Sequence, residues 1–514
     1  MIKKPVSDNK RKWLGLAALM PAIGMVFTDQ TVLPVALPTI QKHLQASDLA
    51  LWWSINAYLL TSAVFLLAGG KIGDRIGYRT TFVLGMVIFA ISSALCGLSF
   101  NVGWLISARA LQGVGAALMI PASTPLLMSI FPPNERGKAS GINVSVSSIF
   151  LIFGPLIGGY FTQYLSWRWI FWINLPLAIL GLVLVFCFIP KSPKRDVRLD
   201  PLGFFFFLIA SSSLIIIIMQ GSAWGWTSRT NEILTSIFVI SAFLLFRREK
   251  NSRHPFIDLS FYRHPIYKAV NISIFATQFV LMITVYRAIF VQDVLDWSPM
   301  LSGTILFFTS LPVLFLSPIA GWLADRSGSK VPIAVGFSML IYSFFWLAFF
   351  VQSSTSMLIL GFLAFGIAVP LIFTPSYTSA MNSIPVQKAG TAFALLATVR
   401  SLSACFGVAV FGSFASHVQF NFFHKAIEEN PETVNLSQSL TEGISYGVKN
   451  IQHLVSAEQL PIVLGYLKES QVEGFFTLHM TIGFILIIAF AFVFILYHRK
   501  PSHRLPPTPG EGWD

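Results

Sequence analysis

Long uninterrupted apolar runs constrain this chain of 514 residues more than any other feature. A helix of ~20 apolar residues crosses the hydrocarbon core of a bilayer, whereas a spanning β-strand would alternate in polarity over ~10 residues. Charged residues make up only 11% of the chain, against ~25% in soluble proteins, so they could not cover a water-exposed surface. We therefore expect an all-α polytopic membrane protein with 14 transmembrane helices. The runs lie near residues 14–36, 50–70, 80–99, 102–125, 139–161, 169–189, 201–220, 232–246, 267–291, 300–323, 331–351, 356–379, 390–412 and 474–497.

The basic residues are distributed unequally between the two sets of segments that connect these runs. If the N-terminus is cytoplasmic, 26 of the 35 Lys and Arg residues fall on the cytoplasmic side, 6 fall on the opposite side and 3 lie inside spans. This separation follows the positive-inside rule, and an even number of spans returns the chain to the side on which it began. We expect a multi-pass protein of the cell (inner) membrane with both termini in the cytoplasm.

The sequence lacks the motifs typical of an enzyme or an ATP-driven pump, and its charge pattern is not typical of a nucleic-acid-binding protein. It carries no H-E-x-x-H segment, no suitably placed G-x-S-x-G segment and no G-x-x-x-x-G-K-[ST] loop. Its formal charge of +13 is spread over short clusters, and its three cysteines lie within apolar runs, where packing is their expected role. We therefore expect no enzymatic activity, no catalytic residue, no cofactor, no metal and no nucleic acid partner.

A ten-residue pattern occurs twice, each time at the expected cytoplasmic end of a span. Residues 70–79 read G-K-I-G-D-R-I-G-Y-R, and residues 321–330 read G-W-L-A-D-R-S-G-S-K. Glycine at the first position would let two helices approach, glycine at the eighth would permit a tight turn, and the Asp-Arg pair could bridge to a neighbouring helix end. We interpret the pattern as a conformational gate. Its candidate residues are Gly70, Asp74, Arg75, Gly77, Arg79, Gly321, Asp325, Arg326 and Gly328.

These loops and four further segments resemble the motifs of the major facilitator superfamily, and within it those of the fourteen-span drug:proton antiporters of the EmrB/QacA type. The segments are D-Q-T-V-L-P-V-A-L-P-T-I at 29–40, R-A-L-Q-G-V-G-A at 109–116, G-P-L-I-G-G at 154–159 and W-R-W-I-F-W-I-N-L-P at 167–176. The resemblance implies two six-helix bundles that rock around a central cavity, with two extra helices inserted between them. The domains are then 1–200 for the N-terminal bundle, 201–265 for the inserted helices and a cytoplasmic linker, and 266–514 for the C-terminal bundle with a long outer loop at 413–473.

Asp29 is the only carboxylate well inside a clear span, and Arg109 lies at a similar depth in the fourth span. Each lies about seven residues, or ~10 Å at the helical rise, from the outer end of its run. An ionisable side chain inside the bilayer costs ~2.5–3.5 kcal/mol on insertion scales, so its presence needs a reason. We expect Asp29 to take a coupling proton beside Arg109. The alternatives are a static ion pair, or a carboxylate that caps a backbone break near Pro34.

Two further groups are candidates for the transport path. Gly154, Pro155, Gly158 and Gly159 combine a helix kink with close helix packing, and the resemblance implies that such a segment seals the cavity against leakage. Arg400 lies midway along the thirteenth run and would line a substrate cavity. Arg287 and His479 are weaker candidates, since Arg287 could extend towards the outer end of its run and a lone intramembrane histidine is usually a packing residue.

The sequence thus predicts a secondary active exporter that couples proton entry to efflux of small hydrophobic or amphiphilic compounds by alternating access. An excess of cations over anions inside the spans favours neutral or anionic amphiphiles. The alternative is a dedicated exporter of one physiological metabolite, siderophore or lipid. The resemblance also suggests a periplasmic adaptor and an outer-membrane channel as partners. The loop at 413–473 could serve their docking, either as a small helical cap or as an adaptable surface loop.

Overall fold

The computed structural model describes residues 8–132, 135–194, 200–251, 261–262, 264–384, 389–430, 433, 455–456 and 459–498. Regular secondary structure over these residues is helical, without strands. Fourteen helical segments are long and apolar enough to cross a membrane, which confirms the predicted fold class and number of spans.

The N-terminal half contains six spans. Polar side chains cap the N-terminal ends of two of these helices. Ser47 accepts a hydrogen bond from the Ala50 N–H at 3.4 Å, and Asn101 accepts one from the Trp104 N–H at 2.8 Å. The helices are α1 (Asp8–Leu44), α2 (Asp48–Ile76), α3 (Tyr78–Gly97), α4 (Val102–Ile130), α5 (Arg136–Tyr164) and the consecutive pair α6 (Trp169–Trp172) and α7 (Asn174–Phe188), which form the sixth span.

The two inserted spans are the helices α8 (Pro201–Trp224) and α9 (Arg229–Asn251), which pack against each other. Helix α8 also contacts α2 of the N-terminal half and α16 of the C-terminal half. The expected short run at 232–246 is therefore part of a 23-residue helix. Most of the expected cytoplasmic linker after α9 lies outside the described residues.

The C-terminal half also contains six spans, two of which are broken into consecutive helices at Met282 and Leu311. The break at Leu311 precedes Pro312, which cannot donate a backbone hydrogen bond. The helices are α10 (Pro265–Leu281), α11 (Ile283–Asp293), α12 (Pro299–Ser310), α13 (Pro312–Ser327), α14 (Lys330–Phe349), α15 (Thr355–Asn382), α16 (Ala389–Glu429) and α18 (Leu460–His498).

Much of the outer loop expected at 413–473 is helical in the structure. Helix α16 continues to Glu429, and α18 begins at Leu460. Phe423 and Ile427 of α16 pack against Val463 of α18, so the described parts form the helical cap rather than the adaptable loop. Apolar residues continue at helical spacing past the membrane-spanning run, which is why both helices extend. Residues 434–454 of this expected loop lie outside the described residues.

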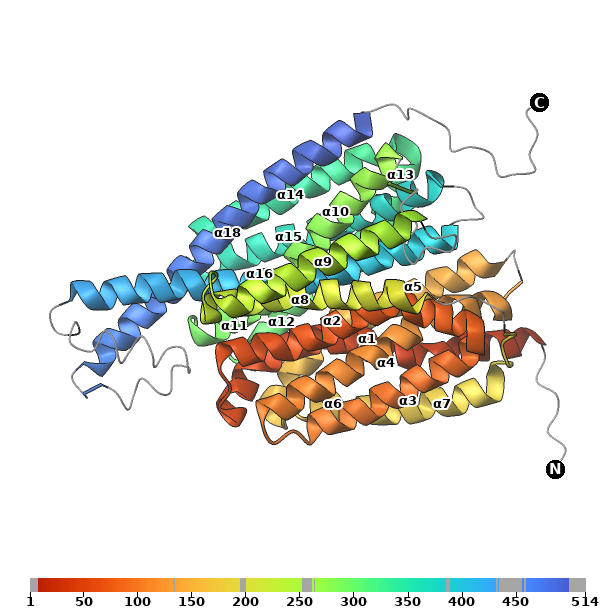
Figure 1. Cartoon of the computed structure of the whole chain (residues 1–514), viewed down its shortest axis with the longest axis horizontal. Helices are drawn as coiled ribbons and strands as arrows, with labels where there is room; N and C mark the ends of the chain where they lie inside the picture. Colours follow the sequence, from red (N-terminus) through yellow and green to blue (C-terminus); the bar gives the residue numbers. More distant parts are fainter. Residues whose placement is uncertain are drawn as a thin grey trace.

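The molecule has two distinct ends (Figure 1). Helix α1 begins and α18 ends at the same end of the helical bundle, which we call the terminal end. The opposite end, where α1 ends at Leu44 and α2 begins at Asp48, is called the loop end. The extended ends of α16 and α18 project beyond the rest of the bundle at the loop end. This arrangement agrees with the even number of spans.

At the terminal end, the two inserted helices are joined by the side chain of Asp200. It accepts a hydrogen bond from the Gly203 N–H at 3.0 Å, and so caps α8, and it forms an ion pair with Arg248 Nη2 of α9 at 2.6 Å. Burial acts to raise the pKa of Asp200, but the hydrogen bonds from Arg248 and Gly203 outweigh it and lower that pKa below its usual range. The ionised form is therefore the one that holds α8 and α9 together.

Replacing Asp200 with Ala is expected to lower the free energy of unfolding by ~0.5–2 kcal/mol, mainly through loss of the helix cap. Asp200→Asn keeps a capping oxygen and should cost less. Since the pKa is lowered in the folded protein, the charge contributes fully at neutral pH, and its contribution is lost as the pH falls through the lowered pKa. Urea unfolding in detergent, followed by circular dichroism, measures these differences. Equal stability of Asp200→Ala and wild type would contradict the capping role.

Candidate functional site

The two ionisable residues singled out in the first and fourth spans are in direct contact. Arg109 Nη1 of α4 lies 2.6 Å from Asp29 Oδ2 of α1, and both residues are 1% exposed. The guanidinium also lies over the ring of Tyr58 of α2, with 4.4 Å between Cζ and the ring centroid. A carboxylate and a guanidinium are therefore paired inside the N-terminal half, sealed from solvent.

Gln112 completes this pair, and the sequence analysis did not identify it as a site residue. Its Oε1 accepts a hydrogen bond from Arg109 Nη1 at 2.7 Å, and its Nε2 donates to Asp29 Oδ1 at 3.1 Å. Arg109 Nε also donates to the backbone carbonyl of Ser54 at 3.2 Å. The spacing could have indicated Gln112, because a residue three positions after Arg109 lies on the same face of an α-helix.

The polar network continues from Gln112 to the sixth span. Gln112 Nε2 lies 3.4 Å from Ser93 Oγ of α3, which also accepts a hydrogen bond from Asn174 Nδ2 at 2.9 Å. The Ser93 hydroxyl donates to the Phe171 carbonyl at 2.9 Å. The network thus joins five spans of one half through neutral groups around one ion pair. Asp29 itself bonds to Arg109 and Gln112 of α4, and the other spans are reached through these two residues.

Helix α5 packs against α1 through the predicted glycine-proline segment. An ideal Cβ on Gly154 would lie 1.9 Å from Thr31 Oγ1, and one on Gly158 would lie 2.6 Å from the Val32 carbonyl oxygen. Pro155 cannot donate a hydrogen bond to the carbonyl of Leu151, four residues earlier. The Thr31 hydroxyl donates to that carbonyl instead, at 3.0 Å. Helix α5 therefore fits closely against the helix that carries Asp29.

The same segment of α5 forms a contact between the two halves at the loop end. An ideal Cβ on Gly159 would lie 2.7 Å from the Pro299 carbonyl oxygen of α12, and one on Gly303 would lie 2.3 Å from the Pro155 carbonyl oxygen. The Met300 N–H donates to the side chain of Gln163 at 2.9 Å. Backbone therefore lies against backbone across the two halves, with no room for a side chain at these glycines.

Helix α1 also contacts the C-terminal half close to its ion pair. Gln292 Nε2 of α11 donates to the Val35 carbonyl at 3.0 Å, and Val35 packs against Ala288 and Leu306. Val35 lies six residues, or less than two helical turns, beyond Asp29 on the same helix. A rotation or tilt of α1 at Asp29 would therefore also move Val35 and change its contacts with the C-terminal half.

The repeated loops form turns at the terminal end. Gly77, between α2 and α3, has a φ of 95°, and Gly328, between α13 and α14, has a φ of 77°, so both turns use a conformation that favours glycine. The Tyr78 hydroxyl donates to Asp74 Oδ1 at 2.5 Å, and Arg79 Nη2 donates to the Phe186 carbonyl of α7 at 3.2 Å. The first loop is thus attached within its own half.

The expectation that Gly70 and Gly321 permit a close helix approach is wrong for this structure. An ideal Cβ on Gly70 would lie 3.8 Å from its nearest neighbour, and one on Gly321 would lie 3.6 Å away, both ordinary contacts. The close approach is at Gly69 instead, where a Cβ would lie 2.2 Å from the Ala117 carbonyl oxygen of α4. One residue of displacement rotates the side-chain direction by about 100°, so the adjacent glycine faces the neighbouring helix.

The Asp-Arg pairs of the repeated loops differ in their surroundings. Asp74 binds Tyr78 at the start of the next helix, as expected for a bridge to a helix end, whereas Arg75 is exposed. In the second copy, Asp325 and Arg326 are both exposed, and Arg326 Cζ lies 5.5 Å from the ring centroid of Trp322 on its own helix. The two loops are therefore similar as turns but not in their side-chain contacts.

The other two arginines that the sequence places inside spans, Arg287 and Arg400, lie in the C-terminal half. Arg400 of α16 is partly exposed, and its Nε donates to Gln278 Oε1 of α10 at 3.0 Å. Arg287 of α11 is fully buried against α14, α15 and α18, so its side chain does not extend towards the end of its helix as the sequence suggested.

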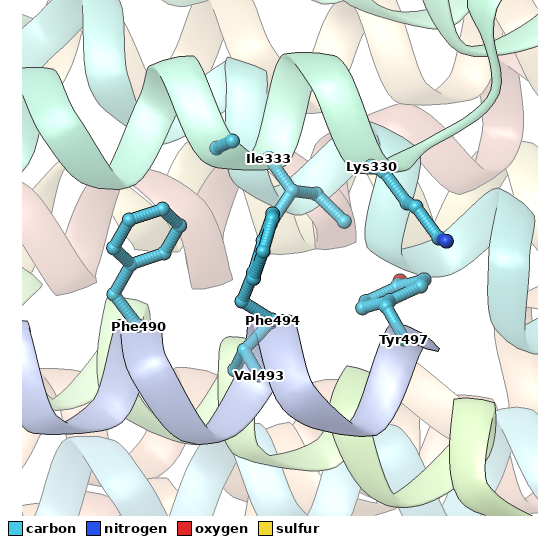
Figure 2. A pocket seen from close by; sticks show the side chains of 7 residues that line it. Lys330, Ile333, Phe490, Val493, Phe494 and Tyr497 are labelled. Carbon is cyan, nitrogen blue, oxygen red and sulfur yellow. The ribbon is translucent and has the colours of Figure 1, made fainter. Parts of the chain in front are cut away.

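Two hollows lie in the terminal-end part of the C-terminal half. The larger has a volume of about 450 Å³ and lies between α10, α16 and α18, where Lys268, Asn271 and Phe275 line it together with Val399. The smaller, between α14 and α18, has a volume of about 10 Å³, enough for roughly one water molecule (Figure 2). Of these two hollows among the described residues, the larger has room for an organic solute.

The comparisons with known proteins agree with this architecture. Residues 19–408 match the family described as the Major Facilitator Superfamily. The chain belongs to this superfamily. It is 31% identical over 411 residues to the multidrug resistance protein Stp of Mycobacterium tuberculosis, a match that covers 79% of this chain and 76% of Stp. It is 28% identical over 514 residues to the tetracenomycin C resistance and export protein of Streptomyces glaucescens, covering 97% of this chain and 95% of that protein.

The solved structures of the superfamily show the same fold. A bacterial homologue of the human lysosomal transporter Spinster, crystallised in an inward-facing and unoccupied conformation, superposes with a TM-score of 0.65. The match covers 95% of this chain and 97% of the homologue at 17% sequence identity. The similarity to the resistance proteins is consistent with the drug:proton antiporter group of the superfamily that the sequence motifs resemble.

Proposed function

We propose that this superfamily member is a secondary active exporter that couples proton entry to the efflux of small hydrophobic or amphiphilic compounds. The buried cluster of Asp29, Arg109 and Gln112 is the observation that carries this proposal. Ionisable groups within membrane spans are costly, and in transporters they mark ion and proton pathways. The similarity to a multidrug resistance protein and to an antibiotic export protein supports the direction and the substrate class.

In this proposal, Asp29 is the proton-binding residue. When Asp29 is ionised, its carboxylate attracts Arg109 and accepts a hydrogen bond from Gln112. Protonation would neutralise Asp29 and remove the ionic part of its attraction to Arg109. Gln112 Oε1 already accepts from Arg109, so the guanidinium keeps a partner while α1 moves. Proton binding would thus favour one arrangement of α1 relative to α4.

The movement of α1 would then change access to the substrate. Helix α1 contacts α5 through Gly154 and Gly158, and α5 contacts α12 of the other half through Gly159. The contacts between α5 and α12 hold the halves together at the loop end, so their separation would open that end. With both termini in the cytoplasm, as the distribution of basic residues predicts, the loop end faces outwards. The terminal end would then be the side from which substrate enters.

The experiment uses purified protein reconstituted into liposomes in one orientation, with fluorescent amphiphiles of cationic, neutral and anionic character. An imposed pH gradient should drive substrate accumulation, a protonophore should abolish it, and ATP should have no effect. Transport that is indifferent to the pH gradient would contradict proton coupling. Because a tetracenomycin exporter is among the relatives, export of one compound alone is the second candidate. Accumulation of a single class in the panel would favour it.

A further inference from the structure

A second buried arginine lies within the C-terminal half, and the proposed coupling does not use it. Arg287 of α11 is 0% exposed, and its Nε donates to Nε2 of His479 on α18 at 3.1 Å. Its Nη1 and Nη2 atoms are buried without a hydrogen-bond partner in the part of the chain that the structure describes. The ion pairs among the described residues involve other cations. Both terminal nitrogens of a permanent cation are therefore unsatisfied.

His479 does not supply the missing negative charge. Its Nδ1 lies 2.8 Å from the Phe475 carbonyl oxygen, which can only accept a hydrogen bond. Nδ1 therefore carries the hydrogen, and the lone pair on Nε2 accepts from Arg287. In this arrangement the imidazole is neutral. It orients the guanidinium without balancing its charge.

The other neighbours of the Arg287 guanidinium are aromatic rings. Arg287 Cζ lies 4.7 Å from the ring centroid of Phe365, 5.1 Å from that of Phe344 and 5.5 Å from that of Phe362. The ring of Phe475 stacks on His479, with 3.8 Å between centroids. Cation–π contacts offset only part of the cost of a buried charge, and they leave the two Nη groups without acceptors.

We propose that the Nη groups of Arg287 bind a small monovalent inorganic anion of the chloride class inside the C-terminal half. A water molecule could accept hydrogen bonds from Nη1 or Nη2, but it would leave the positive charge unbalanced. An anion provides both the acceptor and the counter-charge. Because Arg287 is fully buried among large aromatic side chains, a small ion fits beside it better than an organic acid does. The hollow of about 450 Å³ is lined by other residues.

The test measures the thermal stability of the full-length protein in lipid nanodiscs while chloride replaces gluconate at constant ionic strength. The melting temperature of the wild type should rise saturably with chloride, and bromide should replace chloride. Arg287→Gln should abolish the response. Arg168→Gln is the matched control, because Arg168 already donates to the Ser99 carbonyl at 2.9 Å, and it should respond like the wild type.

Binding of radiolabelled chloride provides a direct measurement. It should be more than ~10-fold weaker in Arg287→Gln than in the wild type, since removal of one partner of a buried charge pair is costly. Equal stability of the wild type in chloride and in gluconate would overturn the proposal, and this comparison requires no variant to fold. An unchanged chloride response in Arg287→Gln would overturn it as well. Neither readout depends on transport, so the result is independent of the proposed proton coupling.

Discussion

Asp29→Asn is expected to abolish substrate accumulation driven by a pH gradient, while downhill transport continues. A gradient of one pH unit stores ~1.4 kcal/mol per proton, so coupling to one proton would sustain about a tenfold substrate concentration ratio. An uncoupled variant should reach a ratio of ~1. Asn keeps an oxygen that can accept from Arg109, but it cannot bind the proton that would drive the cycle. The measurement is the steady-state ratio in liposomes with an imposed gradient.

Two variants separate coupling from stability. Asp29→Asn alone leaves Arg109 as an unbalanced buried charge, and removal of one partner of a buried ion pair costs ~3–5 kcal/mol. The double variant Asp29→Asn with Arg109→Gln removes both charges, so it should recover much of the stability without recovering accumulation. Asp296→Asn removes an exposed carboxylate, whose nearest ionic partner Lys468 lies 3.6 Å away, and it should behave like the wild type. Wild-type accumulation by Asp29→Asn would show that another group carries the proton.

Gly159→Val is expected to shift the protein away from the conformation closed at the loop end. A Cβ at this position would lie 2.7 Å from the Pro299 carbonyl oxygen, and the backbone of α12 cannot yield as a flexible side chain could. Overpacking of this kind costs ~1–3 kcal/mol, which changes the ratio of the two conformations by roughly 5–150-fold. The variant should therefore favour separation of α5 and α12 and should transport slowly.

Spin labels on α5 and α12 at the loop end, read by pulsed electron resonance, measure this shift in the distance distribution. Gly137→Val is the matched control, because Gly137 lies on the same helix and a Cβ there meets nothing within 4 Å. It carries the same loss of glycine and gain of a branched side chain without the clash. If Gly159→Val and Gly137→Val gave the same distance distribution as the wild type, the contact between α5 and α12 would not control access.

The pairing of Asp29 with Arg109 illustrates how far the sequence reaches. Each lies at a similar distance from the end of its apolar run, and the fixed rise of an α-helix converts that spacing into depth. Depth alone does not give contact, which requires that both side chains face the same neighbour. Gln112, Ser93 and Asn174 were missed because neutral polar residues are common in spans and their role depends on which helix faces they occupy.

The glycines of α2 also show that the sequence does not reveal which residue of a helix faces its neighbour. The repeated pattern drew attention to Gly70, whereas the helix contact is at Gly69, one position away. Conversely, Gly77 and Gly328 could be assigned from the sequence, because a tight turn with positive φ is a local property of the backbone. The extension of α16 and α18 beyond their apolar runs was left open between a helical cap and an adaptable loop, because hydropathy measures the membrane-spanning part of a helix and not its length.

The sequence by itself determined that this protein spans the membrane fourteen times, that a ten-residue motif is repeated in its two halves and that it resembles the drug:proton antiporters. These properties depend on local composition, on periodicity and on the position of a few charges along the chain. Only the tertiary structure decided which side chains meet. It placed Asp29 against Arg109 and Gln112, Gly159 against Pro299, and Arg287 among aromatic rings with two free nitrogens in the described structure. Such contacts depend on the rotation of each helix about its own axis, which packing between helices fixes and hydropathy does not record.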